Sequence, residues 1–264
     1  MKLGVIGVGN MASAILESVF ENDVFSPSDI ALFDPYSKMV EIFKNRGCLV
    51  VASVDELLNC SNMILLAIKP NNIEDALSNL SVDTCGKCFI SIAAGISSDY
   101  LKKFLSKGTY VIRVMPNTPI MVNCGASAIA MSEDVPVEYY NRAVSIFSSA
   151  GSVSFVKESL INAVTAVNGS GPAYFFTMAD EMVKTAEEQG IDRETALFLT
   201  AKTMEGAARM LLESGRSPSE LADAVSSPGG TTLAALNEMK NSGFYNALKK
   251  GMLACIERAN EIGK

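Results

Sequence analysis

A loop late in the chain has the composition of a receptor for a small anion. Residues 226–232 read Ser-Ser-Pro-Gly-Gly-Thr-Thr, and a helical pattern follows directly, from Leu233 to Met239. Glycines let the backbone approach a ligand closely, and the first N–H groups of a helix are unsatisfied donors with a partial positive charge. The loop is therefore suited to a carboxylate or a phosphate. An ordinary glycine-rich loop capped by threonine is the alternative interpretation.

A second set of residues, at the start of the chain, has the spacing of a dinucleotide-binding loop. Residues 7–12 read Gly-Val-Gly-Asn-Met-Ala, which is the pattern GxGxxA, and they lie between an expected strand and an expected helix. Gly7 would permit the tight turn, Gly9 would let a pyrophosphate approach, and Ala12 would pack the helix on the strand. Asn10 and Met11 complete the loop as cofactor-binding candidates.

Asp34 ends the second expected strand, where a carboxylate can accept hydrogen bonds from a ribose diol. It would repel a 2′-phosphate, and no arginine follows it, so the residue favours NADH over NADPH. Ser37 and Lys38 could still reach a phosphate, which leaves use of both cofactors open. The alternative is that Asp34 caps the next helix, with Pro35 as the first helical residue, and both roles are compatible.

Two further segments follow expected strands. Ala67-Ile68-Lys69-Pro70 follows the fourth strand, and Ala93-Ala94-Gly95 follows the fifth. Parallel sheets bind ligands at the carboxyl ends of their strands, and small residues there would let a nicotinamide ring lie on the backbone. Ordinary strand-to-helix turns would have the same composition.

The composition excludes several classes of function. The 264 residues are 48% hydrophobic and 19% charged, with a net charge of −7 and no basic patch, so nucleic acid is not an expected partner. No apolar run is long enough to cross a membrane, and the strand pattern that starts at Lys2 leaves no room for a signal peptide. A cytoplasmic protein is expected.

The residue types also limit the mechanism. The chain has no histidine, which excludes a histidine general base and a Ser-His-Asp triad. Of the six cysteines, only Cys85 and Cys88 form a CxxC pair. A single CxxC is weak evidence for zinc or redox chemistry, so no metal is expected and a structural role is favoured.

Short apolar strands and amphipathic helices alternate through the first part of the chain. Strands are expected at 2–7, 30–34, 48–51, 63–68, 88–92 and 110–114, with further ones at 126–130 and 153–156. Helices are expected after the glycine loop, from Pro35 onward and over 138–149. This alternation predicts a parallel sheet with helices on both faces.

From about residue 157 the pattern becomes entirely helical. Helices are expected over 160–167, 173–189, 193–213 and 244–262. We therefore divide the chain into residues 1–157, which form the dinucleotide-binding domain, and residues 158–264, which form a helical domain. Because these helices are rich in apolar residues, a second subunit is the expected partner, and a compact monomeric bundle is the alternative.

Five motifs occur in an order that resembles the pyrroline-5-carboxylate reductase family. They are residues 7–12, 67–70 (Ala-Ile-Lys-Pro), 115–119 (Met-Pro-Asn-Thr-Pro), 169–174 (Gly-Ser-Gly-Pro-Ala-Tyr) and 226–232. The resemblance extends over essentially the whole chain, and the last two motifs are the most specific. It implies a Rossmann-like domain followed by an all-helical dimerisation domain, and a homodimer that is often assembled into a ring of five dimers.

The resemblance also implies roles for individual residues. The Ser227 hydroxyl and the N–H groups of Gly230 and Thr231 would hold a substrate carboxylate, and the Thr232 hydroxyl would lie near the ring nitrogen as the catalytic residue. Asn117 would join the cofactor-binding residues. The reaction would be hydride transfer from NADH or NADPH to the C=N bond of 1-pyrroline-5-carboxylate, the last step of proline biosynthesis. The family usually prefers NADPH, and Asp34 is a departure from the residues that its NADPH-preferring members carry just after the second strand.

Two other functions fit parts of the pattern. A 3-hydroxyacid dehydrogenase also has a Rossmann domain followed by helices, but it uses a lysine after a glycine-rich turn, and here no lysine follows Gly171 until Lys184. A non-catalytic dinucleotide-sensing module would not need the anion-binding loop at 226–232.

Overall fold

The first part of the chain forms an eight-stranded, mostly parallel sheet. The computed structural model describes residues 2–132 and 134–263. The strand order is β3-β2-β1-β4-β5-β6-β7-β8. The strands are β1 (Leu3–Ile6), β2 (Ile30–Phe33), β3 (Leu49–Val50), β4 (Met63–Leu66), β5 (Cys88–Ser91), β6 (Tyr110–Met115), β7 (Gly125–Met131) and β8 (Gly151–Lys157). The expected Rossmann-like sheet is confirmed.

One strand pair in the sheet is antiparallel. β6 pairs with β7 in antiparallel register, whereas all other neighbours are parallel. The connection between them, Pro116–Cys124, holds only a short 3₁₀ turn (Thr118–Val122), and a parallel crossover needs a dozen or more residues. β8 then returns parallel to β7 after a full helix.

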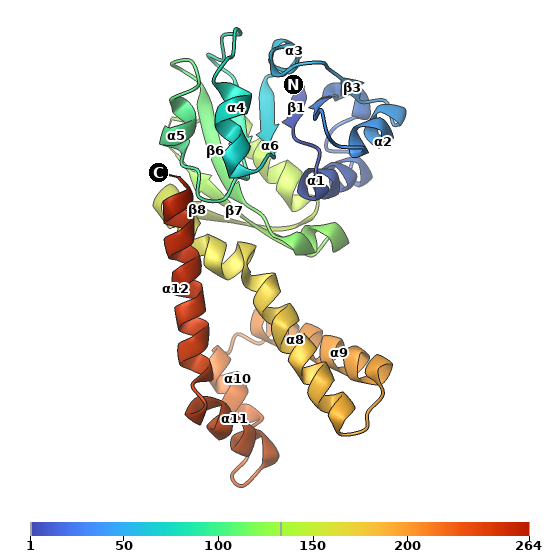
Figure 1. Ribbon diagram of the computed structural model, residues 1–264, viewed down its shortest axis with the longest axis vertical. Helices are drawn as coiled ribbons and strands as arrows, with labels where there is room; N and C mark the ends of the chain where they lie inside the picture. Colours follow the sequence, from blue (N-terminus) through green and yellow to red (C-terminus); the bar gives the residue numbers. More distant parts are fainter. Residues whose placement is uncertain (1, 133, 264) are drawn as a thin grey trace. The chain divides into compact units, whose positions relative to one another are not determined.

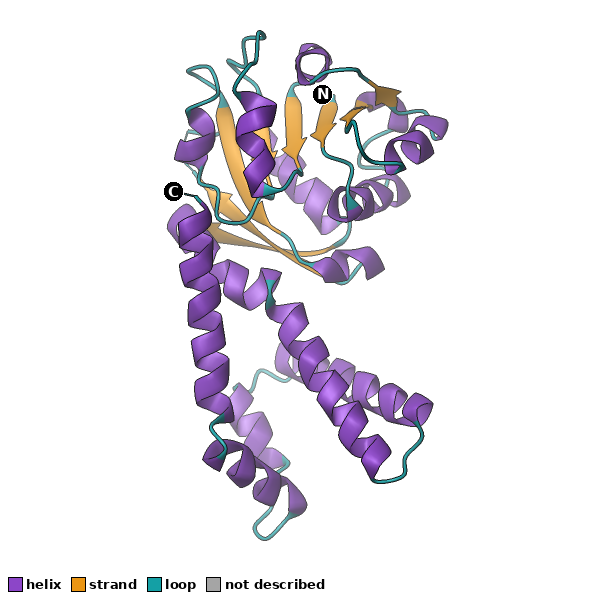
Figure 2. Ribbon diagram, viewed as in Figure 1, coloured by secondary structure: helices purple, strands orange, loops and turns teal. Residues whose placement is uncertain are grey.

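Helices cover both faces of this sheet (Figures 1 and 2). One core lies under α1 (Asn10–Glu21), α2 (Met39–Asn45) and α6 (Val137–Ser148). The other lies under α3 (Val54–Cys60), α4 (Ile73–Leu77) and α5 (Ser98–Lys102). Because side chains alternate along a strand, β4 sends Met63 and Leu65 to the first core and Ile64 and Leu66 to the second. The first core holds α1 against the sheet, and the two cores together hold the strands in fixed positions.

The helix expected from Pro35 begins later than predicted. α2 starts at Met39, and Lys38 precedes it as the N-cap. The interpretation of Asp34 as a helix cap is therefore wrong. Its carboxylate instead accepts hydrogen bonds from the N–H groups of Tyr36 and Ser37, at 2.9 and 3.0 Å, and forms a local turn that competes with the helix.

The second part of the described chain is helical. Its helices are α7 (Ile161–Val164), α8 (Gly171–Glu188), α9 (Arg193–Glu213), α10 (Pro218–Ala224), α11 (Thr231–Asn241) and α12 (Phe244–Ile262). The sequence interpretation missed α10, although Ser217 and Glu220 form a capping box at its start. The single helix expected over 160–167 is instead α7 followed by a π-helical turn, Thr165–Gly169.

The chain divides into two compact units. Unit 1 comprises residues 1–172 and 254–264, and unit 2 comprises residues 173–253. The last turns of α12 therefore belong with the sheet, while the two ends of the expected helical domain fall in unit 1. Within residues 2–132 and 134–263, none of the helices combines the length and the apolarity needed to cross a lipid bilayer.

Candidate active site

Gly7 makes the turn between β1 and α1 and requires the absence of a side chain. Its φ is +90°, and its N–H donates to the Phe33 carbonyl at 2.9 Å. A Cβ placed on Gly7 would lie 2.8 Å from the Ala67 carbonyl oxygen and 2.6 Å from Cγ2 of Ile68. The segment after β4 therefore lies directly against the glycine loop, so only glycine fits this position.

Gly9 faces open space at the start of α1. It is the N-cap of α1, and no side chain accepts a hydrogen bond there. A Cβ placed on Gly9 would meet no atom within 4 Å. An uncapped helix N-terminus that the backbone leaves open is suited to a pyrophosphate. The loop residues Gly7, Gly9, Asn10 and Met11 thus fit the expected dinucleotide, and their contacts with it stay a prediction.

Asp34 joins the glycine loop to the segment after β2. Its Oδ2 accepts the Val8 N–H at 2.7 Å, while its Oδ1 accepts the two N–H groups of Tyr36 and Ser37. The Ser37 hydroxyl donates to the Val8 carbonyl at 2.6 Å and completes the connection. A carboxylate has about four acceptor positions, so about one remains for a ribose hydroxyl.

A cavity of about 370 Å³ lies in unit 1 at the carboxyl ends of β4, β5 and β6. Eight residues that the sequence marked for cofactor binding line it: Met11, Ala67, Ile68, Lys69, Pro70, Ala93, Ala94 and Asn117. Parallel sheets bind ligands at this edge. The cavity fits the nicotinamide half of the expected cofactor in position and in its small, mostly apolar lining.

The cavity also has lining residues that the sequence interpretation missed. They are Ile92, Met115, Pro116, Thr118, Thr165, Gly169 and Ser170. Most of them belong to the motifs at 115–119 and 169–174, so these motifs carried the signal. Gly169 permits a close approach, since a Cβ there would lie 3.0 Å from Sδ of Met115. The π-helical turn and the end of β6 thus form adjoining walls.

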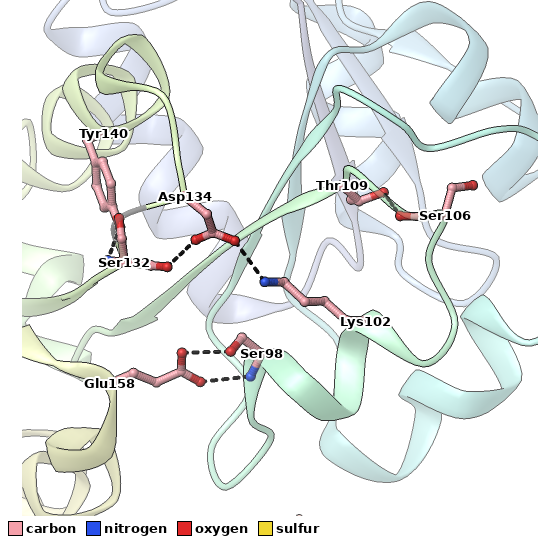
Figure 3. Close-up of polar contacts among 8 residues, drawn as sticks. All are labelled: Ser98, Lys102, Ser106, Thr109, Ser132, Asp134, Tyr140 and Glu158. Carbon is pink, nitrogen blue, oxygen red and sulfur yellow. Dashed lines mark hydrogen bonds and ion pairs between the residues drawn. The ribbon is translucent and has the colours of Figure 1, made fainter.

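A polar network fixes the segments next to this cavity. The buried Arg113 guanidinium on β6 pairs with the Glu158 carboxylate, with 3.5 Å between nitrogen and oxygen. Glu158 in turn accepts the Ser98 N–H at 2.8 Å and the Ser98 hydroxyl at 2.6 Å (Figure 3). Burial lowers the pKa of Arg113, and the charge and hydrogen bond of Glu158 oppose that change. The network ties β6 to the first residue of α5 and to the turn that precedes α7.

A second group in Figure 3 lies along the same region of unit 1. Asp134 accepts hydrogen bonds from the Ser132 hydroxyl and from Lys102 on α5, and these bonds lower the pKa of Asp134. The Thr109 hydroxyl donates to the Ser106 carbonyl at 2.7 Å and closes the turn before β6. These contacts support the sheet and place no further titratable group in the cavity.

The expected anion-binding loop lies in unit 2. The Gly230 N–H donates to the Ser227 carbonyl at 2.9 Å, with Pro228 and Gly229 in the middle of the turn. Gly229 has φ of +72°, which suits the third position of a type II turn. Gly230 is the N-cap of α11, with no side-chain cap and no acidic residue in the first turn.

The substrate-binding candidates Ser227, Gly230, Thr231 and Thr232 thus lie on one turn and the helix start that follows it. Ser227 and Thr231 are exposed, and Thr232 is half-buried. The first N–H groups of α11 have no intrahelical partner, which makes this end a suitable anion site. The carboxylate contacts and the role of Thr232 stay predictions.

The CxxC residues have environments that do not favour a shared ligand. Cys88 is buried in β5, and burial raises the pKa of its thiol to about 12, whereas Cys85 is exposed. A metal ligand or a redox thiol acts as thiolate, and Cys88 is a neutral thiol at ordinary pH. Among the described residues, no group of three or more His, Cys, Asp or Glu side chains is placed to hold a metal ion.

Comparisons with known proteins agree with the motifs. Residues 158–262 match a family described as pyrroline-5-carboxylate reductase dimerisation, and residues 2–95 match one described as NADP oxidoreductase, coenzyme F420-dependent. The pyrroline-5-carboxylate reductase of Methanosarcina acetivorans is 37% identical, over 100% of this chain and 98% of the relative.

Solved structures show the same likeness. A pyrroline-5-carboxylate reductase from Coxiella burnetii is 32% identical, with a TM-score of 0.88, over 100% of this chain and 98% of that one. The Plasmodium falciparum pyrroline carboxylate reductase with NADP bound is 25% identical, with a TM-score of 0.90, over 100% and 98% of the two chains.

Proposed function

The chain belongs to the pyrroline-5-carboxylate reductase family. We propose that the residues of its cavity in unit 1 bind the cofactor and that the loop at 226–232 binds the substrate of the family's reaction. The reaction is reduction of the C=N bond of 1-pyrroline-5-carboxylate to L-proline by NAD(P)H. The observation that supports the residue assignment best is the cavity of about 370 Å³, which brings together at one sheet edge residues of the glycine loop, of the segments after β4 and β5, and Asn117.

The cofactor supplies the hydride, and the residues of this chain bind and orient. Gly9 and the first turn of α1 are to hold the pyrophosphate, because the helix end is uncapped and open. Ala67, Ala93 and Asn117 are to hold the nicotinamide half in the cavity. Met115 and Thr165 exclude water from the same space.

The substrate carboxylate is to bind at the start of α11. The Ser227 hydroxyl and the N–H groups of Gly230 and Thr231 are the donors, and the absence of acidic residues in the first turn supports this choice. The Thr232 hydroxyl orients the ring nitrogen by a hydrogen bond. A hydroxyl is too weak an acid to be a bulk proton source, so its role is positioning first, with relay of a proton from water second.

The experiment that tests this assignment replaces Thr232 by valine, which keeps the shape and removes the hydroxyl. We expect kcat to fall about tenfold or more while the dissociation constant of the cofactor stays unchanged. Ser242→Ala, at the other end of α11, removes a hydroxyl that donates to the Glu238 carboxylate and is the matched control. Normal kcat/KM in Thr232→Val would contradict the role of Thr232.

We propose that the enzyme favours NADH over NADPH. The Asp34 carboxylate lies at the end of β2, where it would repel a 2′-phosphate, and its geometry leaves about one acceptor position for a ribose hydroxyl. The Plasmodium falciparum relative was solved with NADP. The preference therefore needs a direct comparison of the two cofactors, which is described below.

We further propose that the protein is a homodimer, that five such dimers form a ring, and that it acts in the cytoplasm. Large apolar side chains on α8 and α9 are exposed in the single chain, among them Phe175, Phe176 and Phe198. The match of residues 158–262 to a dimerisation family supports the same assignment, together with the division into residues 1–157 and 158–264. Sedimentation and cell fractionation test the assembly and the location.

A further inference from the structure

Two asparagines continue the β6–β7 pairing past the point where the backbone can do so. The antiparallel register pairs Val114 with Ile129 and Met115 with Ala128. The next residue, Pro116, has no N–H to donate. At the following residue the Asn117 side chain continues the pairing, and its Oδ1 accepts the Ala126 N–H at 2.9 Å.

Asn168 completes this connection from the π-helical turn. Its Nδ2 donates to the Met115 carbonyl and to the Ala126 carbonyl, both at 2.8 Å. Its Oδ1 accepts a hydrogen bond from Nδ2 of Asn117 at 2.9 Å. Both N–H groups of the Asn168 amide are thus used, on the carbonyls of Met115 in β6 and Ala126 in β7, and its oxygen is used by Asn117.

The position of Asn168 gives these bonds a consequence for the cavity. Met115, Pro116 and Asn117 form one wall of the cavity, and Thr165 and Gly169 form the adjoining wall. Asn168 lies within the turn that supplies the second wall, where the Ser170 N–H reaches back five residues to the Thr165 carbonyl at 2.8 Å. Such π-helical turns are frequent at functional sites.

We propose that Asn168 is a positioning residue for hydride transfer. Its amide holds the π-helical wall against the end of β6 and so fixes the space in which the nicotinamide ring is to lie. It also sets the orientation of Asn117, which keeps one N–H and one lone pair for the ring's carboxamide. This proposal rests on the proposed function, since it assumes a dinucleotide in the cavity.

The distinguishing variant is Asn168→Ala, measured with two ligands. We expect the dissociation constant of the reduced dinucleotide to rise at least fivefold. The dissociation constant of ADP-ribose, which lacks the nicotinamide ring, should stay within twofold. Turnover with 1-pyrroline-5-carboxylate should fall about tenfold, with a larger kinetic isotope effect from a dinucleotide deuterated at the transferred position, because misalignment slows the hydride step itself.

Asn22 offers a matched control. Its Nδ2 also donates to two backbone carbonyls, those of Ser18 and Ser149, and so links two elements of unit 1. Asn22→Ala should lower the unfolding temperature by a similar amount and leave both dissociation constants and the isotope effect unchanged. If Asn168→Ala behaves in the same way as Asn22→Ala, the role of Asn168 is only structural and the proposal is overturned.

Two further measurements keep the test decisive. Asn168→Ser shortens the side chain but keeps one donor, so it replaces the alanine variant if that variant does not fold. The ratio of the dissociation constant of the reduced dinucleotide to that of ADP-ribose should lie between the ratios of the wild-type and alanine proteins. A wild-type ratio in the serine variant would contradict the proposal. If wild type binds the dinucleotide but does not reduce the imine, the proposed function fails, and the comparison with ADP-ribose still decides the role of Asn168.

Discussion

Replacement of Asp34 by asparagine separates its charge from its hydrogen bonds. The carboxylate accepts three backbone N–H groups, those of Val8, Tyr36 and Ser37. An amide of the same shape offers one oxygen, so the bonds on one side are lost. Hydrogen bonds to charged groups contribute about 1.5–3 kcal/mol when they are sheltered from water. Because Asp34 is half-exposed, we expect Asp34→Asn to lower the free energy of unfolding by about 1 kcal/mol.

The charge has a larger effect on the choice of cofactor. A 2′-phosphate carries about −1.5 to −2 at pH 7. Two unit charges about 4 Å apart interact by about 1 kcal/mol in water and by more at a protein surface. The Asp34 carboxylate at that separation therefore opposes NADPH by about 2 kcal/mol, which corresponds to a factor of about 30 in the dissociation constant.

We therefore expect Asp34→Asn to lower the ratio of NADPH to NADH dissociation constants by about thirtyfold, and the wild-type ratio to shrink at high salt. Cofactor fluorescence measures both constants, and the chain has no tryptophan to interfere. Asp55→Asn is the control, because Asp55 also accepts from a backbone N–H, that of Ser81, elsewhere in unit 1. An unchanged ratio in Asp34→Asn would show that Asp34 only ties the two loops together.

Three other predictions concern the glycine loop, the buried thiol and the anion site. Gly7→Ala should cost about 2–4 kcal/mol of stability, because Gly7 has a positive φ and lies against the segment after β4. Gly9→Ala should unfold at the wild-type temperature and bind the dinucleotide at least tenfold more weakly, since a Cβ there meets no atom of the protein. Thermal unfolding and cofactor titration distinguish the two variants, and equal losses of stability would refute the assignment. Cys88 should stay unreactive toward a disulfide reagent in the native protein, while the exposed Cys85 reacts. Because burial raises the pKa of Cys88 in the folded protein to about 12, the contribution of its neutral thiol to the free energy of unfolding should be complete below pH 9 and be lost as the pH rises toward 12. Unfolding curves measured at a series of pH values test this. Ser227→Ala should raise KM for 1-pyrroline-5-carboxylate about tenfold with the cofactor constants unchanged, and an unaltered KM in steady-state kinetics would argue against a carboxylate site there.

Much of the sheet could be predicted because its signals are local. Buried strands are short apolar runs, and the turn at Gly7 follows directly from a glycine pattern between a strand and a helix. Ala67 and Ala93 could be placed at one edge because the carboxyl ends of parallel strands meet there. The start of α10 had a local signal too, the capping box from Ser217 to Glu220, which was overlooked.

Other features depend on contacts between distant residues. The sequence Asp34-Pro35 is compatible with a helix cap and with a local turn. The structure has the turn, in which Asp34 accepts the Tyr36 N–H and also the N–H of Val8, a residue 26 positions earlier in the chain. The π-helical turn is stabilised by Asn168 through groups more than 40 residues away in the chain, which no periodicity reveals. The cavity walls could therefore be recognised as motifs but not as a geometry.

The most direct test of the whole account is the initial rate of cofactor oxidation with 1-pyrroline-5-carboxylate, measured in parallel with NADH and NADPH. We expect the protein to oxidise a reduced dinucleotide when the imine is present, with a kcat/KM for NADH well above that for NADPH. A clear preference for NADPH would contradict the role of the Asp34 charge. No oxidation of either cofactor by the purified, folded protein would contradict the reductase mechanism built on the cavity and the loop at 226–232.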